Sequence, residues 1–325
     1  MMKSLSNVSW DVCQGMIEVI HWYLFSSYTF FGPSMNIPGI RISSTLRTNI
    51  LGMQAKFLKI GGDPKSPSRP PLKMNEKISM NNNNLFGLQQ RVVCAESLLF
   101  LMDALYKLKP SLQKLLPKQN NHQLNQFYQS SVETLTELRE IIYKELCHRL
   151  VPADTLVTKV QNVDWNTNDI PMTHSPYIDL ISASLEGFKN RFQNLQKSTN
   201  PPLSKDTIQT IWSMMISHIF DCLLEGYATP QCTAEGRAMM GIDYRNLIDK
   251  INQLLPNTFT TANLVKNETN HGLIVFPKRL EEYIKGYYEQ EADLEGWLKK
   301  HLNDYTNKQL KALVESGSWN LNIKR

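Results

Sequence analysis

The chain has 325 residues, of which 42% are apolar and 20% charged, a composition typical of folded globular proteins. The net charge is only +5 and the basic residues are spread among acidic ones, so we expect no nucleic-acid partner, which would usually need a clustered basic face. The five cysteines are far apart and form no CxxC pair, which disfavours a disulfide framework or a zinc site and favours reduced thiols in the cytosol.

The first sixty residues predict two helices. Asp11 to Phe31 reads as the first, and no secretory signal is evident before it. The apolar run within it, Met16 to Phe31, is interrupted by Glu18 and His21 and is shorter than the ~20 residues needed to cross a bilayer, so we expect a buried helix. Ser43 to Ile60 resumes helical spacing and forms the second.

The stretch from Gly61 to Asn84 is poor in large apolar residues and rich in proline, glycine, serine and asparagine. Such a segment buries too little surface to offset the entropy of ordering, so we expect a disordered linker. Its basic residues are expected to be solvated, with contact to an acidic membrane or partner as the alternative. They are Lys65, Arg69, Lys73 and Lys77. The predicted organisation is a helical segment 1–60, a linker 61–84 and a helical-rod domain 85–325.

Beyond the linker, three-four spacing of apolar residues predicts one helix after another. One stripe runs from Leu88 to Leu105, where we expect Pro110 to break the helix, and another runs from Leu124 to Leu146. Leu273 to Phe276 is the single strand candidate, inside a stretch, 258–277, that reads as an insertion. Other expected helix starts are Ser175-Pro176 and a capping box formed by Thr306 and Gln309.

The centre of the chain, Ser204 to Leu255, predicts a hairpin of two helices. Ser204 is the expected N-cap of the first helix, and Gly226 is expected at the C′ position just after it. The first helix carries an unbroken apolar face: Ile208, Ile211, Trp212, Met215, Ile216, Ile219, Phe220, Leu223 and Leu224. The second helix ends at Pro256 and presents a similar face: Leu247, Ile248, Ile251, Leu254 and Leu255.

The connector of this hairpin is irregular in a way that no generic turn requires. It contains Glu225-Gly226-Tyr227-Ala228, then Cys232, then Glu235-Gly236-Arg237-Ala238-Met239-Met240. With these residues the chain resembles the C-terminal region of the syndetin family, vesicle-tethering subunits that distinguish an endosome-associated recycling complex from a Golgi-associated retrograde complex. Further matching stretches follow in the same order: Tyr28-Thr29-Phe30-Phe31-Gly32, Leu46-Arg47-Thr48, Leu85 to Leu101, Gln126-Phe127-Tyr128, Glu137-Leu138-Arg139 and Thr306 to Leu313.

The resemblance covers nearly the whole chain, and it implies a fold and a function. The implied fold is all-α, an elongated stack of antiparallel helices of the helical-rod type. The implied function is a non-enzymatic role in endocytic recycling and retrograde transport, with the recycling-complex subunits and SNARE proteins as partners. The implied location is cytoplasmic, peripheral on recycling endosomes and possibly the trans-Golgi network. The long N-terminal coiled coil expected of a full syndetin is missing, so we expect a fragment or a shortened form.

The search for chemistry finds no catalytic, cofactor or metal motif, and we expect none of the three. His218 reads as a core histidine rather than a ligand, and Cys232 reads as a buried thiol rather than a reactive one. His148 beside Cys147 suggests a dyad, but adjacent helical residues point apart. The open alternatives to a tethering subunit are an enzyme with an unrecognised helical active site and a generic helical scaffold.

The connector supplies the candidate site residues: Glu225, Gly226, Tyr227, Cys232, Glu235, Gly236 and Arg237. One hypothesis is a notch that binds a partner. The favoured hypothesis is an ion pair between the glutamates and Arg237 that ties the two helices together while the glycines allow close approach. Tyr283, Tyr287 and Tyr288 are expected to cover a core, with a peptide groove as the alternative.

Overall fold

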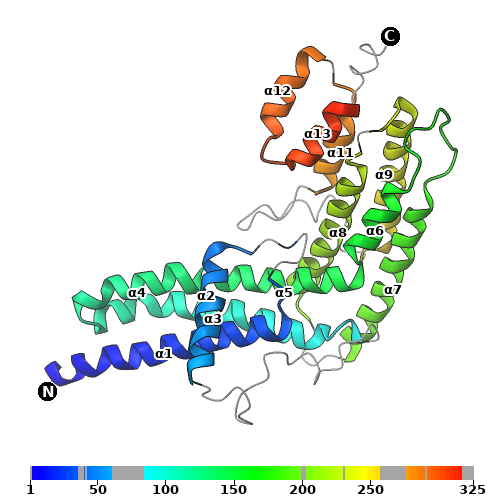
Figure 1. Cartoon of the computed structure of the whole chain (residues 1–325). Coiled ribbons are helices and arrows are strands. Elements are labelled where there is room, and N and C mark those ends of the chain that lie inside the picture. Colours follow the sequence, from blue (N-terminus) through cyan, green and yellow to red (C-terminus); the bar gives the residue numbers. More distant parts are fainter. Residues whose placement is uncertain are drawn as a thin grey trace. The chain divides into compact units, whose positions relative to one another are not determined.

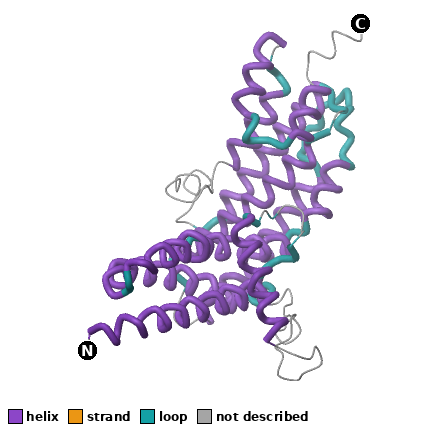
Figure 2. Tube along the Cα trace, turned by 60° about the vertical axis from the view of Figure 1, so that its left-hand side comes forward, coloured by secondary structure: helices purple, strands orange, loops and turns teal. Residues whose placement is uncertain are grey.

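In a computed structural model, every regular element that is described is a helix, which confirms the all-α prediction. The described residues are 2–35, 40, 42–60, 84–198, 203–229, 231–256, 276–289 and 291–316. Figure 2 shows helices and connecting loops over these ranges, and no strand. Most of the predicted linker, residues 61–83, and most of the strand candidate, residues 273–275, lie outside the described residues.

The chain divides into two compact units, Met1–Leu146 and Cys147–Arg325, and the boundary falls inside one helix. The organisation predicted from the sequence, with a domain from 85 to 325, remains a prediction. We describe each unit by itself.

The first unit contains several long helices (Figure 1), and a series of short helical turns separates the last two of them. Its elements are α1 (Met2–Phe31), α2 (Ser44–Ile60), α3 (Leu88–Leu115), η3 (Lys118–Asn120), α4 (Asn121–Phe127), the π-helical turn η4 (Tyr128–Val132) and α5 (Thr134–Leu150). The predicted apolar stripe from Leu124 to Leu146 is buried throughout. It continues through η4, where the Tyr128 hydroxyl donates to the Leu105 carbonyl of α3 at 2.6 Å.

A buried arginine ties three of these helices together. Arg91 of α3 is 1% exposed, and its Nη1 donates to the carbonyls of Phe31 (2.7 Å) and Ile142 (3.2 Å). Its Nε donates to the carbonyl of Phe86 at 3.0 Å. Phe31 ends α1 and Ile142 lies in α5, so one side chain fixes where α1, α3 and α5 meet.

The prediction that Pro110 breaks its helix is wrong, because α3 continues through it to Leu115. Proline removes one backbone donor, which leaves the carbonyl four residues earlier without its helical partner. Both Pro110 and Tyr106 are exposed, and at an exposed position the missing hydrogen bond costs least, which is why the helix can continue.

The second unit contains, besides the end of α5, α6 (Ala153–Gln161), α7 (Pro176–Ser198), α8 (Lys205–Tyr227), α9 (Ala234–Leu254), α11 (Phe276–Gly286), α12 (Glu291–His301) and α13 (Asn307–Ser316). The buried α8 packs against α6 and α11, and α7 packs against α9. The Ser204 hydroxyl accepts from the Thr207 amide at 3.0 Å, which confirms the predicted N-cap of α8. Thr306 and Gln309 form the predicted capping box, with reciprocal hydrogen bonds of 2.9 and 3.3 Å.

Trp212 provides a test of the second core. Its side chain is 1% exposed, and its ring meets that of Phe188 edge-on with 5.0 Å between centroids. Trp212→Ala should lower the free energy of unfolding by about 3–5 kcal/mol, because it empties a large aromatic site. Trp10→Ala, at a half-exposed position of α1, is the control and should cost less in the same denaturant titration. An unchanged transition midpoint for Trp212→Ala would show that Trp212 is not a core residue.

Candidate functional site

The predicted site residues lie on both sides of the α8–α9 connector. Glu225, Gly226 and Tyr227 form the end of α8, Cys232 lies in the loop, and Glu235, Gly236 and Arg237 form the first turn of α9. Thr233 is the N-cap of α9, where its hydroxyl accepts from the Gly236 amide at 3.1 Å. The sequence analysis did not single out Thr233, although threonine is a favoured N-cap residue and Glu235 places a negative charge in the first turn.

Gly226 does not occupy the predicted C′ position, because α8 continues to Tyr227 and is capped at Ala228. The need for glycine there is steric. A Cβ at Gly226 would lie 2.5 Å from Cγ1 of Val160, on α6. The glycine therefore lets α6 approach α8 closely. The sequence analysis did not predict α6.

Gly236 permits an even closer approach. A Cβ at this position would lie 2.0 Å from the carbonyl oxygen of Trp165, in the loop that follows α6. The same carbonyl accepts from the Thr233 amide at 3.0 Å. The first turn of α9 is thus pressed against this loop, and only a residue without a side chain fits there.

The predicted ion pair between the glutamates and Arg237 is wrong as to its partners. Arg237 is 1% exposed and donates to three backbone carbonyls, those of Thr233 (3.0 Å), Tyr287 (3.0 Å) and Cys232 (3.5 Å). Glu225 instead accepts from the Lys308 ammonium and from the Gln309 amide, the latter at 3.2 Å. Glu225 therefore ties α8 to α13, and Arg237 ties α9 to the end of α11.

Tyr227 belongs to a buried chain of hydrogen bonds. The Tyr177 hydroxyl donates to the carboxylate of Asp243 at 2.6 Å, so the Tyr227 hydroxyl, 2.7 Å away, must donate to Tyr177. The Ser175 amide donates to the other oxygen of Asp243 at 2.7 Å. Burial raises the pKa of both phenols well above the usual range. These hydrogen bonds connect α7, α8 and α9 through the side chains of Tyr177, Tyr227 and Asp243.

Cys232 lies where the sequence analysis expected a buried thiol. It is 9% exposed, and burial raises its pKa to about 12, against a smaller opposite effect of Arg237. A thiolate is the reactive form, so this position is unsuited to nucleophilic chemistry near neutral pH. Of the three tyrosines, Tyr283 and Tyr287 are fully buried, while Tyr288 is 52% exposed.

His218 is also a core residue, as predicted. Its Nε2 donates to the Val151 carbonyl at 2.7 Å, and its ring lies 4.2 Å, between centroids, from that of His148. Burial, and then the neighbouring His148 ring, lower the pKa of His218 to about 4, although the hydrogen bond to Val151 opposes this. The imidazole is therefore neutral at physiological pH.

Two searches concern the described residues alone. Within these ranges, no three or more His, Cys, Asp or Glu side chains are grouped so that they could hold a metal ion. No helix in the same ranges combines the length and hydropathy that a membrane span needs.

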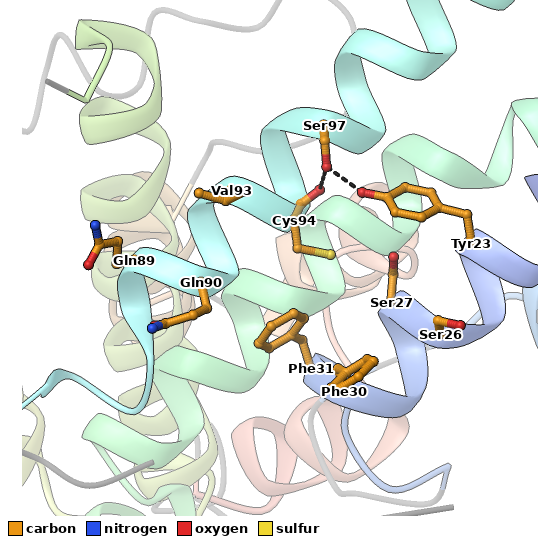
Figure 3. A pocket seen from close by; sticks show the side chains of 10 residues that line it. All are labelled: Tyr23, Ser26, Ser27, Phe30, Phe31, Gln89, Gln90, Val93, Cys94 and Ser97. Carbon is orange, nitrogen blue, oxygen red and sulfur yellow. Dashed lines mark hydrogen bonds between the residues drawn. The ribbon is translucent and has the colours of Figure 1, made fainter. Parts of the chain in front are cut away.

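The first unit has a groove between α1 and α3 that the sequence analysis missed (Figure 3). Its volume is about 540 Å³, and one edge is closed by a hydrogen bond between the hydroxyls of Tyr23 and Ser97. The lining residues are Tyr23, Ser26, Ser27, Phe30, Phe31, Gln89, Gln90, Val93, Cys94 and Ser97. Val93 is 68% exposed, so the groove presents apolar surface to solvent.

The groove continues an exposed apolar stripe along α1. Val8, Val12, Val19 and Tyr23 are all at least 36% exposed, and their spacing places them on one face of the helix. The opposite face, with Cys13, Ile20 and Leu24, is buried in the unit. The acidic side chains of Asp11 and Glu18 are exposed along one edge of the stripe. The expected buried helix thus has two apolar faces, one of which is uncovered within the described residues.

Comparison with known proteins gives matches over most of the chain. A family model described as "Syndetin, C-terminal" matches residues 85–325. Syndetins of Rattus norvegicus and Mus musculus are each 31% identical over 330 residues, covering 97% of this chain and 32% of the relative. Syndetin of Gallus gallus is 30% identical over 330 residues and 33% of its length. The chain therefore spans about a third of the length of the curated relatives it matches.

Two glycines of α9 give a matched pair of substitutions. Gly236→Ala should lower the free energy of unfolding by about 1–3 kcal/mol or more, because the added methyl group overlaps the Trp165 carbonyl. Gly241→Ala adds the same group with no atom within 4 Å, and it should be neutral or stabilising by up to about 1 kcal/mol. Chemical denaturation measures both. Equal stability of the two variants would contradict the close approach at Gly236.

His218 predicts a pH dependence of stability. Its pKa is lower in the folded state than in the unfolded state, where it is about 6.5, so the unfolded chain binds the proton first. The stability contributed by neutral His218 is complete above pH ~6.5 and is lost as the pH falls towards 4, by up to about 3 kcal/mol. His218→Gln should remove this component from the pH profile of unfolding. A profile that His218→Gln leaves unchanged would contradict the assignment.

Proposed function

We propose that this chain, which belongs to the syndetin family, works by protein contact as a subunit or fragment of an endosomal vesicle-tethering complex, without a catalytic step. Its partners are then the other subunits of the recycling complex and SNARE proteins on recycling vesicles. It acts in endocytic recycling and retrograde transport, peripherally on endosomes. Because the chain matches only a third of its relatives, these properties of the whole protein are part of the proposal.

The apolar groove between α1 and α3, which is open to solvent within the described residues, is the observation that supports this proposal most strongly. The polar groups of the connector do not serve it as well, because Arg237, Tyr227 and Asp243 direct their hydrogen bonds at other groups of the same unit. A surface whose donors and acceptors are already paired offers little to a partner, whereas an exposed apolar stripe gains free energy when it is covered.

The shape and charge of the groove indicate what would fill it. Two neighbouring helices with an apolar groove between them can bind a third helix, whose apolar side chains recur at three-four spacing. Asp11 and Glu18 do not line the groove, but they lie along one edge of the apolar stripe of α1 that continues it, and they favour lysine or arginine along one side of that helix. We therefore propose a partner helix that is amphipathic and basic along one edge.

Val93→Glu tests this function. Val93 is 68% exposed, so the substitution should leave folding intact, but it places a charge where the partner helix would bury apolar surface. Expressed with a tag in cells depleted of full-length syndetin, the wild-type chain should capture recycling-complex subunits and speed the return of internalised receptors to the cell surface. The variant should lose at least about tenfold of the captured subunits, since 1.4 kcal/mol corresponds to tenfold.

Leu180→Glu is the matched control, since Leu180 is 45% exposed on α7 and lies outside the groove. It should capture the same subunits as wild type, and circular dichroism should show both variants equally helical. Equal capture by Val93→Glu would remove the groove from the proposal. Failure of the wild-type chain to capture any recycling-complex subunit would contradict the function itself.

A further inference from the structure

The C-terminal end of α3 and the turn into α4 form a basic surface. The small net charge of the whole chain does not reveal it. Residues 104–132 contain four lysines and no aspartate or glutamate, and all of them are described. The nearest acidic residues along the chain are Asp103 and Glu133, which flank the stretch. We call the surface formed by residues 106–118 the lysine tip.

Three of the four lysines are available to a ligand. Lys109 is half-buried and its ammonium lies over the ring of Tyr128, 4.6 Å from the centroid. Lys107, Lys114 and Lys118 are exposed, and among the described residues none of them lies in an ion pair. Unpaired lysines at the end of a helical hairpin create a local positive potential that attracts anionic groups.

Exposed leucines form a row next to these lysines on α3, about 100° around the helix axis. Leu108 is 47% exposed and Leu115 is 68% exposed, whereas the neighbouring Leu105 and Leu116 are buried. Residues seven apart in a helix lie almost one above the other, so Lys107 and Lys114 form one row and Leu108 and Leu115 form a second row beside it. This side of α3 therefore presents a row of positive charge next to a row of apolar side chains.

We propose that the lysine tip binds the surface of a membrane that contains anionic lipids. Leucine side chains at such a surface enter the boundary between headgroups and acyl chains, while lysine side chains extend along them to the lipid phosphates. An acidic protein would not require the exposed leucines, and an apolar protein helix would not require the unpaired lysines. A bilayer with anionic headgroups can contact the lysine row and the leucine row at once.

The inference goes beyond the proposed function and does not rest on it, because the purified chain is measured without any protein partner. The chain is mixed with vesicles of phosphatidylcholine alone, or of phosphatidylcholine with phosphatidylserine, and the bound fraction is measured by sedimentation. Wild type should bind the phosphatidylserine vesicles and should not bind the neutral ones. Added salt should weaken this binding, since the attraction is electrostatic.

Two double variants separate the contributions of charge and insertion. Lys107→Glu with Lys114→Glu should weaken vesicle binding by at least about 25-fold, since each lysine near an anionic surface contributes roughly fivefold. Leu108→Gln with Leu115→Gln keeps the charge and should weaken binding by about tenfold, since both side chains lose apolar burial. The control, Lys159→Glu with Lys197→Glu, makes the same change in net charge at exposed positions of α6 and α7 and should bind as wild type.

Equal affinity of wild type for the two kinds of vesicle would overturn the proposal, as would equal losses in the tip and control variants. Binding that depends on the lysines but not on the leucines would overturn the insertion of the leucines. If no vesicle is bound but polyglutamate is bound through Lys107 and Lys114, the tip is a site for an acidic protein and the lipid assignment is wrong. Thermal unfolding of each variant, followed by circular dichroism, shows that losses do not come from misfolding.

Discussion

Buried arginines that hold backbone carbonyls determine how the helices of each unit meet. The last turn of a helix has carbonyl oxygens without helical partners, and a buried one left unpaired costs about 1–3 kcal/mol. Arg91 donates a hydrogen bond to the carbonyl of Phe31 at the end of α1, and Arg237 donates one to the carbonyl of Tyr287 just after α11. A planar guanidinium has five donors in fixed directions, so each arginine also reaches a second segment of its unit. Replacing either one would remove three hydrogen bonds to backbone carbonyls at once.

This constraint explains why the connector between α8 and α9 is irregular in sequence. Gly236 is required because the Trp165 carbonyl lies where a side chain would begin, and Arg237 follows because carbonyls converge there. Asp243, one turn and a half further along α9, accepts from Tyr177 and from the Ser175 amide. Each of these residues meets a steric or hydrogen-bonding need of the interior. The sequence motif that indicates the family is therefore, in this chain, also a set of residues that the packing of the interior requires.

Much of the fold follows from the sequence, because periodicity and caps are local. The stripes of α5 and α8 and the caps at Ser204 and Thr306 appeared as predicted, and the syndetin resemblance is confirmed. The short α6 was missed, since its nine residues bury only Leu156 and Val160 and are fewer than the ~10–12 residues over which a helical pattern is usually recognised. The partner of Glu225 could not be predicted, because Lys308 is 83 residues away and meets it only through tertiary packing. For the same reason, the apolar face of α1 that remains uncovered could not be told from the face that is buried.

The net charge of the whole chain does not describe the charge of each part of its surface. A net charge of +5 spread over 325 residues argues against a nucleic-acid interface, yet charges act over a Debye length of ~10 Å, so the sum that matters is local. Lys299 and Lys308 lie in ion pairs with carboxylates, whereas Lys107 and Lys114 lie in none within the described part of the chain, with Asp103, one turn before Lys107, as the nearest acidic residue along α3. Exposed lysines therefore differ in what they can attract. The groove that we propose for a partner helix and the lysine tip that we propose for a membrane use the N-terminal and C-terminal parts of α3, so the two proposed surfaces share no residue.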